Sequence, residues 1–275
     1  MMELICIIGS AVITGLLCYF CGWYESVGGI VGTAFAFVGF YIAVMALVFV
    51  IAFFLSAIVD ISKPVKKPSK FYTFVYHLFL SFLIRLFRVK LIVEGEENLP
   101  EGNALFVSNH RSILDPMLLA NKYKSRRILM ISKPQNFRIP IAGGTIHKAG
   151  YMSVDRENDK EALKTIIRAI KYEKEGYSVG VCPEGTRNKT SVNLMEFRHG
   201  SLKVATKANK PIVVCVFHNT QKVMKNLPFK RTKVYLHILK TIYPEEYQGK
   251  TTLEISDYCH EIMQRDIDAF ESANH

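Results

Sequence analysis

The first sixty residues contain two long apolar runs separated by a short break. Leu4 to Trp23 is nearly continuous hydrophobe, and Gly29 to Val59 is a second, longer run. Each reaches the length of about 20 residues that a helix needs to cross the core of a bilayer. The break between them carries a tryptophan, a tyrosine and a glutamate, which suit a membrane interface. The pattern predicts a hairpin of two transmembrane helices over residues 1–60.

The charges that flank these runs predict an orientation. No Lys or Arg lies between Met1 and Asp60, and four lysines follow the second run: Lys63, Lys66, Lys67 and Lys70. By the positive-inside rule that side of the membrane is cytoplasmic, so we expect an integral membrane protein whose remaining residues lie on the cytoplasmic face. A cleaved signal peptide is an alternative for the first run, although it lacks a basic leading segment. A helical hairpin lying within one leaflet is the other alternative.

Residues 61–88 are interpreted as a basic linker followed by an interfacial helix. Pro64 and Pro68 end any helix that continues from the second apolar run. The stretch from Phe71 to Phe87 is aromatic and aliphatic, with Arg85 and Arg88 at its end. This composition predicts an amphipathic helix that lies in the membrane interface and leads into residues 89–275.

From Val89 onward, short β-branched runs alternate with helical patterns. Asp159 to Glu175 places four aliphatic side chains on one helical face and closes at Gly176, and Thr252 to Phe270 repeats the pattern. The expected strands are Leu91–Val93, Ala104–Val107, Ile128–Ile131, Val179–Cys182, Ile212–Phe217 and Val234–Leu239. Strands interleaved with helices predict an α/β domain with a mixed, largely parallel sheet flanked by helices.

The composition narrows the class of partner. The formal net charge of +11 calls for an anionic partner, which leaves nucleic acid, an anionic bilayer or a phosphorylated substrate. The apolar front and cationic remainder favour the bilayer and the phosphate over nucleic acid. Cys18 and Cys21 form a CxxC pair that no second pair or nearby His completes into a zinc site, so we predict free thiols and no metal ligands. GxGxxG, GxxxxGK[ST] and GxSxG are absent from the sequence.

The run NHRSILDP, residues 109–116, directly follows an expected strand. A His with a carboxylate five residues later offers a general base and a group to orient it. In one continuous helix these two side chains would point about 140° apart. Because Pro favours the first helical turn, we expect the helix to begin at Asp115–Pro116, after a turn that folds His110 back onto Asp115. The alternative is an ordinary helix-capping Asp with a solvent-exposed His.

Two further clusters carry candidate charged residues. VCPEGTR ends in Arg187, whose guanidinium can bind a phosphate in bidentate fashion, and its Gly185 allows close approach of the backbone to a ligand. A turn with a surface ion pair between Glu184 and Arg187 is the alternative. GYMSVDR ends in Asp155 and Arg156, for which the alternative is a solvated charge pair at a strand end.

With these blocks the chain resembles the 1-acyl-sn-glycerol-3-phosphate acyltransferase family, within the wider glycerolipid acyltransferases, from about Val93 to Phe217. The resemblance includes NHxxxxD at residues 109–115 and a second block with Lys133, Pro140, Gly143, Gly150 and Arg156 in place. EGTR follows at residues 184–187, and FRHGSLKVA leads into a fourth block at residues 211–215. Four blocks in this order and spacing are specific.

The resemblance implies roles for these residues. His110 would take the proton from the acceptor hydroxyl and Asp115 would hold the imidazole. Arg156 and Arg187 would bind the acceptor phosphate, with Glu184, Gly185 and Thr186 forming that pocket. Asn109 and Lys133 are two further candidate site residues. The family transfers the acyl group directly from an acyl thioester, so no nucleophilic Ser, metal or cofactor is expected.

The resemblance also implies substrates and partners. Acyl-CoA or acyl-carrier protein would be the donor, lysophosphatidic acid the acceptor and phosphatidic acid the product, in a phospholipid membrane. The same chemistry on glycerol 3-phosphate or another lysophospholipid is an alternative, as is a non-catalytic lipid-binding protein. A hydrolase using Ser108 or Ser112 is disfavoured because neither lies in a nucleophile elbow. Cys182 replaces the family's usual aromatic residue and Val214 its second proline, and both changes bear on substrate preference.

Overall fold

The computed structural model describes residues 2–155, 158–190 and 192–273, and it divides into two compact units. The first comprises residues 1–82 and 135–149, and the second residues 83–134 and 150–275. Its α-helices are α1 (Met2–Phe20), α2 (Val27–Ala57), α3 (Lys70–Leu86), α4 (Leu114–Lys122), α5 (Gly143–Lys148), α6 (Asp159–Lys174), α7 (Lys203–Ala208), α8 (Val223–Asn226), α9 (Pro244–Tyr247) and α10 (Thr252–Ala273). Its strands are β1 (Val89–Glu94), β2 (Leu105–Ser108), β3 (Ile128–Ser132), β4 (Met152–Ser153), β5 (Ser178–Val181), β6 (Ile212–His218) and β7 (Thr232–Ile242).

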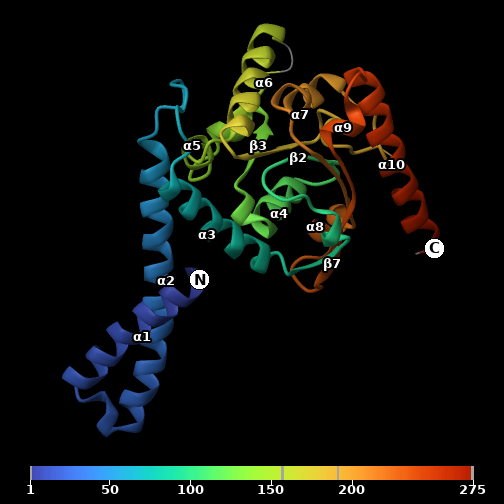
Figure 1. Cartoon of the computed structure of the whole chain (residues 1–275). Helices are drawn as coiled ribbons and strands as arrows, with labels where there is room; N and C mark the ends of the chain where they lie inside the picture. Colours follow the sequence, from blue (N-terminus) through green and yellow to red (C-terminus); the bar gives the residue numbers. More distant parts are fainter. Residues whose placement is uncertain (1, 156–157, 191, 274–275) are drawn as a thin grey trace. The chain divides into compact units, whose positions relative to one another are not determined.

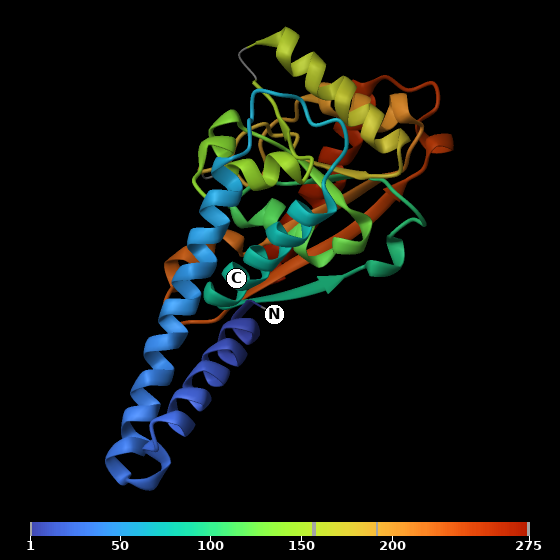
Figure 2. The same cartoon turned by 90° about the vertical axis from the view of Figure 1, so that its left-hand side faces the viewer.

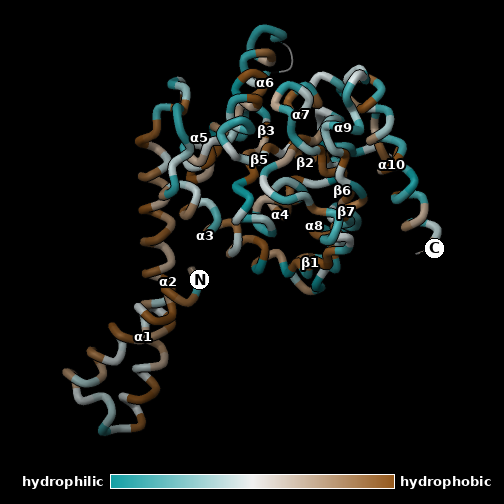
Figure 3. Tube along the Cα trace, viewed as in Figure 1, coloured by the Kyte–Doolittle hydropathy of each residue, from teal (hydrophilic) through white to brown (hydrophobic). Residues whose placement is uncertain are grey.

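Two long apolar helices dominate the first unit. Helix α1 runs alongside the N-terminal part of α2, and α2 is hydrophobic along most of its length (Figures 1, 2 and 3). Both helices are long and apolar enough to cross a membrane, and most of their residues are exposed. Exposed apolar surface on this scale is costly in water, which favours membrane association. The two helices predicted over residues 1–60 are confirmed as helices.

The remaining helices of the first unit pack against the second half of α2. The ring of Phe49 lies edge-on to the rings of Phe79 and Phe82 on α3, at 5.4 and 6.0 Å between centroids. The backbone N–H of Gly144 on α5 donates a 3.0 Å hydrogen bond to Ser56 Oγ at the end of α2. A helix over Lys70–Leu86 confirms the helix predicted at Phe71–Phe87. The predicted domain boundaries after residues 60 and 88 stay predictions.

The second unit is built on a seven-stranded sheet with the order β1-β7-β6-β2-β5-β3-β4. Every neighbouring pair is parallel except β6 and β7, which are antiparallel. The mixed, largely parallel sheet is therefore confirmed. β2 lies between β5 and β6, so the loops that follow these buried strands meet at one edge of the sheet.

Helices cover both faces of the sheet. Leu105 and Val107 of β2 belong to a buried cluster with residues of α6, α7 and α10. Phe106 points to the opposite face, where it stacks on Tyr123 at the end of α4 with 5.9 Å between ring centroids. This alternation is what a parallel strand buried on both faces requires. Burial on two sides makes the strand that leads into His110 a rigid support.

Local signals set the ends of the helices, as α6 illustrates. Asn158 Oδ1 accepts a 3.2 Å hydrogen bond from the backbone N–H of Glu161 and caps the start of α6. Gly176 adopts a positive φ of 88° after its end. The helix predicted at Asp159–Glu175 is observed at Asp159–Lys174. By contrast, the two-residue strand β4 was not predicted, because a run that short carries no periodicity.

Candidate active site

The loop between β2 and α4 brings His110 and Asp115 together. Their side chains are joined by a 3.2 Å hydrogen bond between His110 Nδ1 and Asp115 Oδ2. Helix α4 begins at Leu114, one residue before the predicted start, so Asp115 lies in its first turn. His110 precedes the helix, and the intervening turn directs its imidazole back onto the carboxylate. The expected contact between the two side chains is therefore present.

Burial makes Asp115 a fixed anchor for the imidazole. Asp115 is fully buried, and its Oδ2 also accepts a 2.7 Å hydrogen bond from the backbone N–H of Ser112. Its Oδ1 has no hydrogen-bond partner within the described part of the chain. The His110 side chain is 21% exposed. One imidazole nitrogen is thus held by a buried carboxylate, while the other points away from it.

Glu184 holds the main chain of the same loop. Its Oε1 accepts a 2.6 Å hydrogen bond from the backbone N–H of His110, and its Oε2 accepts one of 3.1 Å from the backbone N–H of Met195. The backbone N–H of Asn188 donates a 2.7 Å hydrogen bond to the carbonyl of His110. Burial raises the pKa of the Glu184 carboxyl, and the two N–H donors act in the opposite direction. The loop after β5 therefore fixes the backbone of His110 from both sides.

Glu184 and Arg187 do not form the surface ion pair weighed above. Glu184 is only 4% exposed and its carboxylate faces the backbone of His110 and Met195. Arg187 is exposed, and in residues 2–155, 158–190 and 192–273 no hydrogen bond or ion pair holds it. Arg156, the second predicted phosphate ligand, lies outside the described residues.

Lys133 and Thr186 meet beside the same loop. Lys133 Nζ, just beyond β3, donates a 3.0 Å hydrogen bond to Thr186 Oγ1. Gly185 has a φ of +75°, and a Cβ there would lie 2.9 Å from Arg198 Nε. A side chain at position 185 would be strained and would collide with Arg198. Position 185 therefore requires the backbone freedom and small size of glycine. The side chain of Arg198 lies beside it, a residue that the sequence offered only as part of the FRHGSLKVA block.

Asn109 anchors the loop to the neighbouring strand. Its Nδ2 donates a 3.0 Å hydrogen bond to the carbonyl of Phe217, and its Oδ1 accepts one of 2.8 Å from the backbone N–H of Phe217. Both atoms of the amide are used by the backbone of β6, so Asn109 positions the residue that follows it. No motif predicts this pairing, because Phe217 is 108 residues away.

The remaining motif positions lie in or around the sheet. Val214, at the second proline position of the fourth block, is fully buried in β6. Cys182 is half-buried, with its Sγ 3.6 Å from Ser108 Oγ. Pro140 and Gly143 of the second block fall in residues 135–149, which belong to the first unit.

Comparison with known proteins finds a family model and relatives that are similar to this chain. The acyltransferase family model matches residues 90–218. A 1-acyl-sn-glycerol-3-phosphate acyltransferase of Borreliella burgdorferi is 31% identical over 54% of this chain and 60% of its own. The chloroplastic LPAT1 of Arabidopsis thaliana, of the same description, is 36% identical over 56% of this chain and 43% of its own. The chain therefore spans about half the length of these curated relatives.

A solved structure supports the fold. The crystal structure of the 1-acyl-sn-glycerophosphate acyltransferase PlsC from Thermotoga maritima superposes with a TM-score of 0.58 and 22% identity. The match covers 82% of this chain and 95% of the other. At this identity the structural match shows a shared fold alone. The similarity in sequence is the one to the family model and the relatives given above. Residues 90–218, which carry the His110–Asp115 pair, match the acyltransferase family model.

Proposed function

We propose that this protein transfers a fatty acyl group from an acyl thioester to the sn-2 hydroxyl of lysophosphatidic acid, giving phosphatidic acid. The observation that carries the proposal is the 3.2 Å contact of His110 Nδ1 with the buried Asp115 carboxylate, in a loop held by Glu184. A polarised imidazole on a rigid loop is what general-base activation of a hydroxyl needs. The acceptor in the names of the relatives supports lysophosphatidic acid.

The proposed reaction uses the two imidazole nitrogens differently. The Nδ1–H of His110 donates to Asp115 Oδ2, which leaves the lone pair on Nε2 free to accept a proton. Nε2 takes the proton of the acceptor hydroxyl as its oxygen attacks the thioester carbonyl carbon. The tetrahedral intermediate then collapses, the carbon–sulfur bond breaks, and the thiolate recovers the proton from His110. Asp115 stabilises the imidazolium between these two steps.

Cations beside the loop would recognise the acceptor phosphate. Arg187 is exposed, and a guanidinium can donate two parallel hydrogen bonds to phosphate oxygens. Lys133 Nζ lies 3.0 Å from Thr186 Oγ1 in the same loop and would add a second positive charge. Arg156 is proposed as a further phosphate ligand. In this arrangement Glu184 contributes by fixing the backbone of His110.

The proposed setting is the cytoplasmic surface of a membrane. Helix α2 has 31 residues, which is about 46 Å at 1.5 Å per residue, against a bilayer core of about 30 Å. Lys63, Lys66, Lys67 and Lys70 follow its end and are suited to anionic headgroups. The lipid acceptor would then be present where the enzyme is anchored.

The test is a transfer assay with matched donors and acceptors. The purified full-length chain is incubated with labelled acyl-CoA or acyl-carrier protein and with lysophosphatidic acid, glycerol 3-phosphate or lysophosphatidylcholine. We expect labelled phosphatidic acid that disappears in His110→Ala. Faster labelling of glycerol 3-phosphate or of lysophosphatidylcholine would overturn the proposed acceptor, and no transfer with any pair would overturn the proposed activity.

A further inference from the structure

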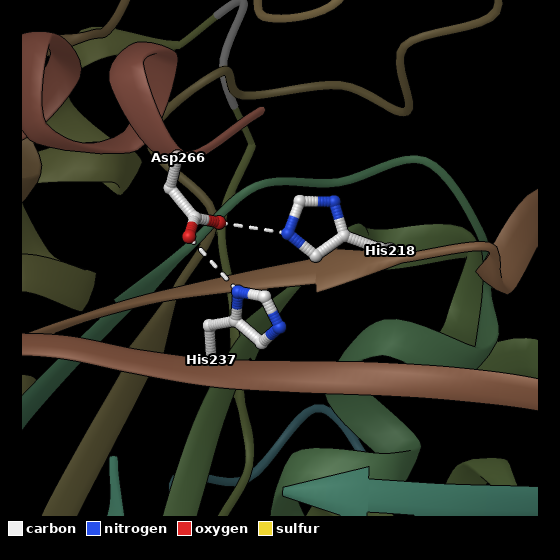
Figure 4. Close-up of side chains that lie close together, drawn as sticks. All are labelled: His218, His237 and Asp266. Atoms are coloured by element: carbon white, nitrogen blue, oxygen red, sulfur yellow. Dashed lines mark hydrogen bonds and ion pairs between the residues drawn. The ribbon is translucent and has the colours of Figure 1, made fainter. Parts of the chain in front are cut away.

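Three side chains from distant parts of the second unit lie close together. His218 ends β6, His237 lies in β7, and Asp266 lies on α10 (Figure 4). His218 Nε2 is 2.7 Å from Asp266 Oδ2, and His237 Nδ1 is 2.9 Å from Asp266 Oδ1. One donor atom from each residue lies within 4.8 Å of the other two. The transfer chemistry described above does not use any of them.

The surroundings of this His–Asp–His cluster favour a positive charge at its centre. The side chains of His218, His237 and Asp266 are 6%, 15% and 18% exposed. A carboxylate buried to this extent is costly unless a cation compensates its charge. Within the described part of the chain, the ion-pair partners of Asp266 are the two imidazoles. A divalent ion bound among the three would take the place of the imidazole protons and compensate the carboxylate.

The donor set fits a first-row transition metal. Two imidazole nitrogens and one carboxylate, with room for a solvent ligand, are a recurrent set for zinc and its neighbours. Zinc ligands 2.0–2.2 Å from the ion lie about 3.4 Å from one another. The Asp266 oxygens, which are 2.7 and 2.9 Å from the two imidazole nitrogens, would therefore withdraw by about 0.7 and 0.5 Å. Of the three residues, His218 also lines a pocket, together with Asn219, Gln221 and Lys222.

Neighbouring residues hold both histidine rings in place, as metal ligands require. His237 Nε2 lies 3.5 Å from Glu94 Oε2, and Glu94 is its partner across the parallel β1–β7 pair. A carboxylate near this nitrogen favours the tautomer with its proton on Nε2, which leaves Nδ1 available as a ligand. The ring of His218 stacks on Phe270 of α10, with 3.9 Å between centroids and 10° between planes.

We propose that His218, His237 and Asp266 bind one divalent transition-metal ion of the zinc class, in a structural site outside the acyl-transfer centre. The ion would tie α10 to β6 and β7. The side chain of Asn109 bonds to the backbone of Phe217, next to His218, so the site also lies close to the support of the motif loop. This proposal revises the expectation from sequence that the chain has no metal ligands.

The experiment measures binding of Zn²⁺ itself to the tag-free, full-length chain in detergent after removal of metals with a chelator. Isothermal titration is expected to show one Zn²⁺ per chain with a Kd on the order of micromolar or tighter. Co²⁺ in place of Zn²⁺ is expected to give visible absorption bands of a site with nitrogen and oxygen ligands. Neither readout depends on acyl transfer, so failure here and failure of the proposed function are distinguishable.

Matched variants locate the ion. Asp266→Asn is expected to weaken Zn²⁺ binding by more than about 100-fold, and Glu94→Ala by about tenfold. Asp268→Asn and His260→Ala, which change residues of α10 outside the cluster, are expected to bind as the wild type does. If Asp266→Asn does not fold, Glu94→Ala decides the matter. The proposal would be overturned if the folded wild type bound no Zn²⁺ saturably, or if Asp266→Asn and Glu94→Ala both bound Zn²⁺ with wild-type affinity. The three side chains would then form only hydrogen bonds with one another.

Discussion

The backbone N–H of His110 donates a 2.6 Å hydrogen bond to Oε1 of Glu184, which lies 74 residues further along the chain. The contact joins the loop after β2 to the loop after β5, two adjacent parallel strands. Glu184 thereby controls where the imidazole lies without contacting it. This relationship separates the residues proposed to perform the chemistry from those that position them.

Removal of the proposed base should nearly abolish turnover. General-base catalysis contributes about 10² to 10⁴ in rate, so His110→Ala should lower kcat by that factor and leave the melting temperature close to that of the wild type. Asp115→Asn should give a loss of similar kind, because the imidazole loses the acceptor that orients it. Steady-state assays with His260→Ala as control test this. A kcat above about a tenth of the wild-type value in His110→Ala would refute the assignment.

Glu184→Ala should affect turnover and stability together. The change leaves the backbone N–H groups of His110 and Met195 without acceptors, at a cost of about 1–3 kcal/mol each if they stay buried. We expect a lower melting temperature and a lower kcat, with a nearly unchanged KM for the acceptor. Glu196→Ala changes an exposed neighbour and is the control. A raised acceptor KM with normal stability would instead place Glu184 against the substrate.

Arg187→Lys separates phosphate recognition from a structural role. An ammonium cannot reproduce the two parallel hydrogen bonds of a guanidinium, each worth about 1.5–3 kcal/mol. The acceptor KM should therefore rise by roughly one to two orders of magnitude, while the acyl-donor KM and the melting temperature stay unchanged. Arg265→Lys, on exposed α10 surface, is the control. An unchanged acceptor KM in a folded Arg187→Lys variant would remove Arg187 from the site.

Glu173 should make stability depend on pH. Burial raises the pKa of Glu173 to about 8 from a usual value of 4.5, and neither carboxyl oxygen has a hydrogen-bond partner within the described residues. The folded state binds this proton more tightly, so its stabilising effect is complete below about pH 4.5 and is lost as the pH rises to about 8, at up to about 1.4 kcal/mol per unit.

Glu173→Gln should remove that dependence. We expect the variant to match the wild type near pH 5 and to melt at a higher temperature near pH 8, because Gln is never charged. Circular dichroism melts across this range make the comparison. Glu175→Gln, an exposed residue at the end of the same helix, should leave the dependence in place. A wild-type melting temperature independent of pH would show that Glu173 titrates normally.

The membrane anchor predicts how the protein fractionates. Full-length protein should remain in membranes after carbonate and high-salt washes, because α1 and α2 expose apolar surface along their lengths. A truncation that starts at Lys70 should bind anionic vesicles through α3, and salt should release it. Vesicle sedimentation at low and high salt measures this. Recovery of the full-length chain in a salt wash would contradict a spanning hairpin.

The sequence alone determined the elements whose pattern is local. Helix α6 was predicted within one residue, since a 3.6-residue repeat and a terminal Gly lie in one segment. The two apolar helices and the contact of His110 with Asp115 follow from equally local signals, namely run length and the Pro in the first turn of α4. β4 was missed because two residues cannot show a period.

Only the tertiary structure decided which distant residues meet. Glu184 reaches the backbone of His110 because β2 and β5 are neighbours, and the pairing of strands 74 residues apart leaves no periodic trace in either segment. Asp266 meets His218 and His237 from 48 and 29 residues away for the same reason, across β6, β7 and α10. Local patterns fix helices and strands through backbone geometry and burial of one face. Long-range contacts depend on strand order, which is set by the packing of the whole core.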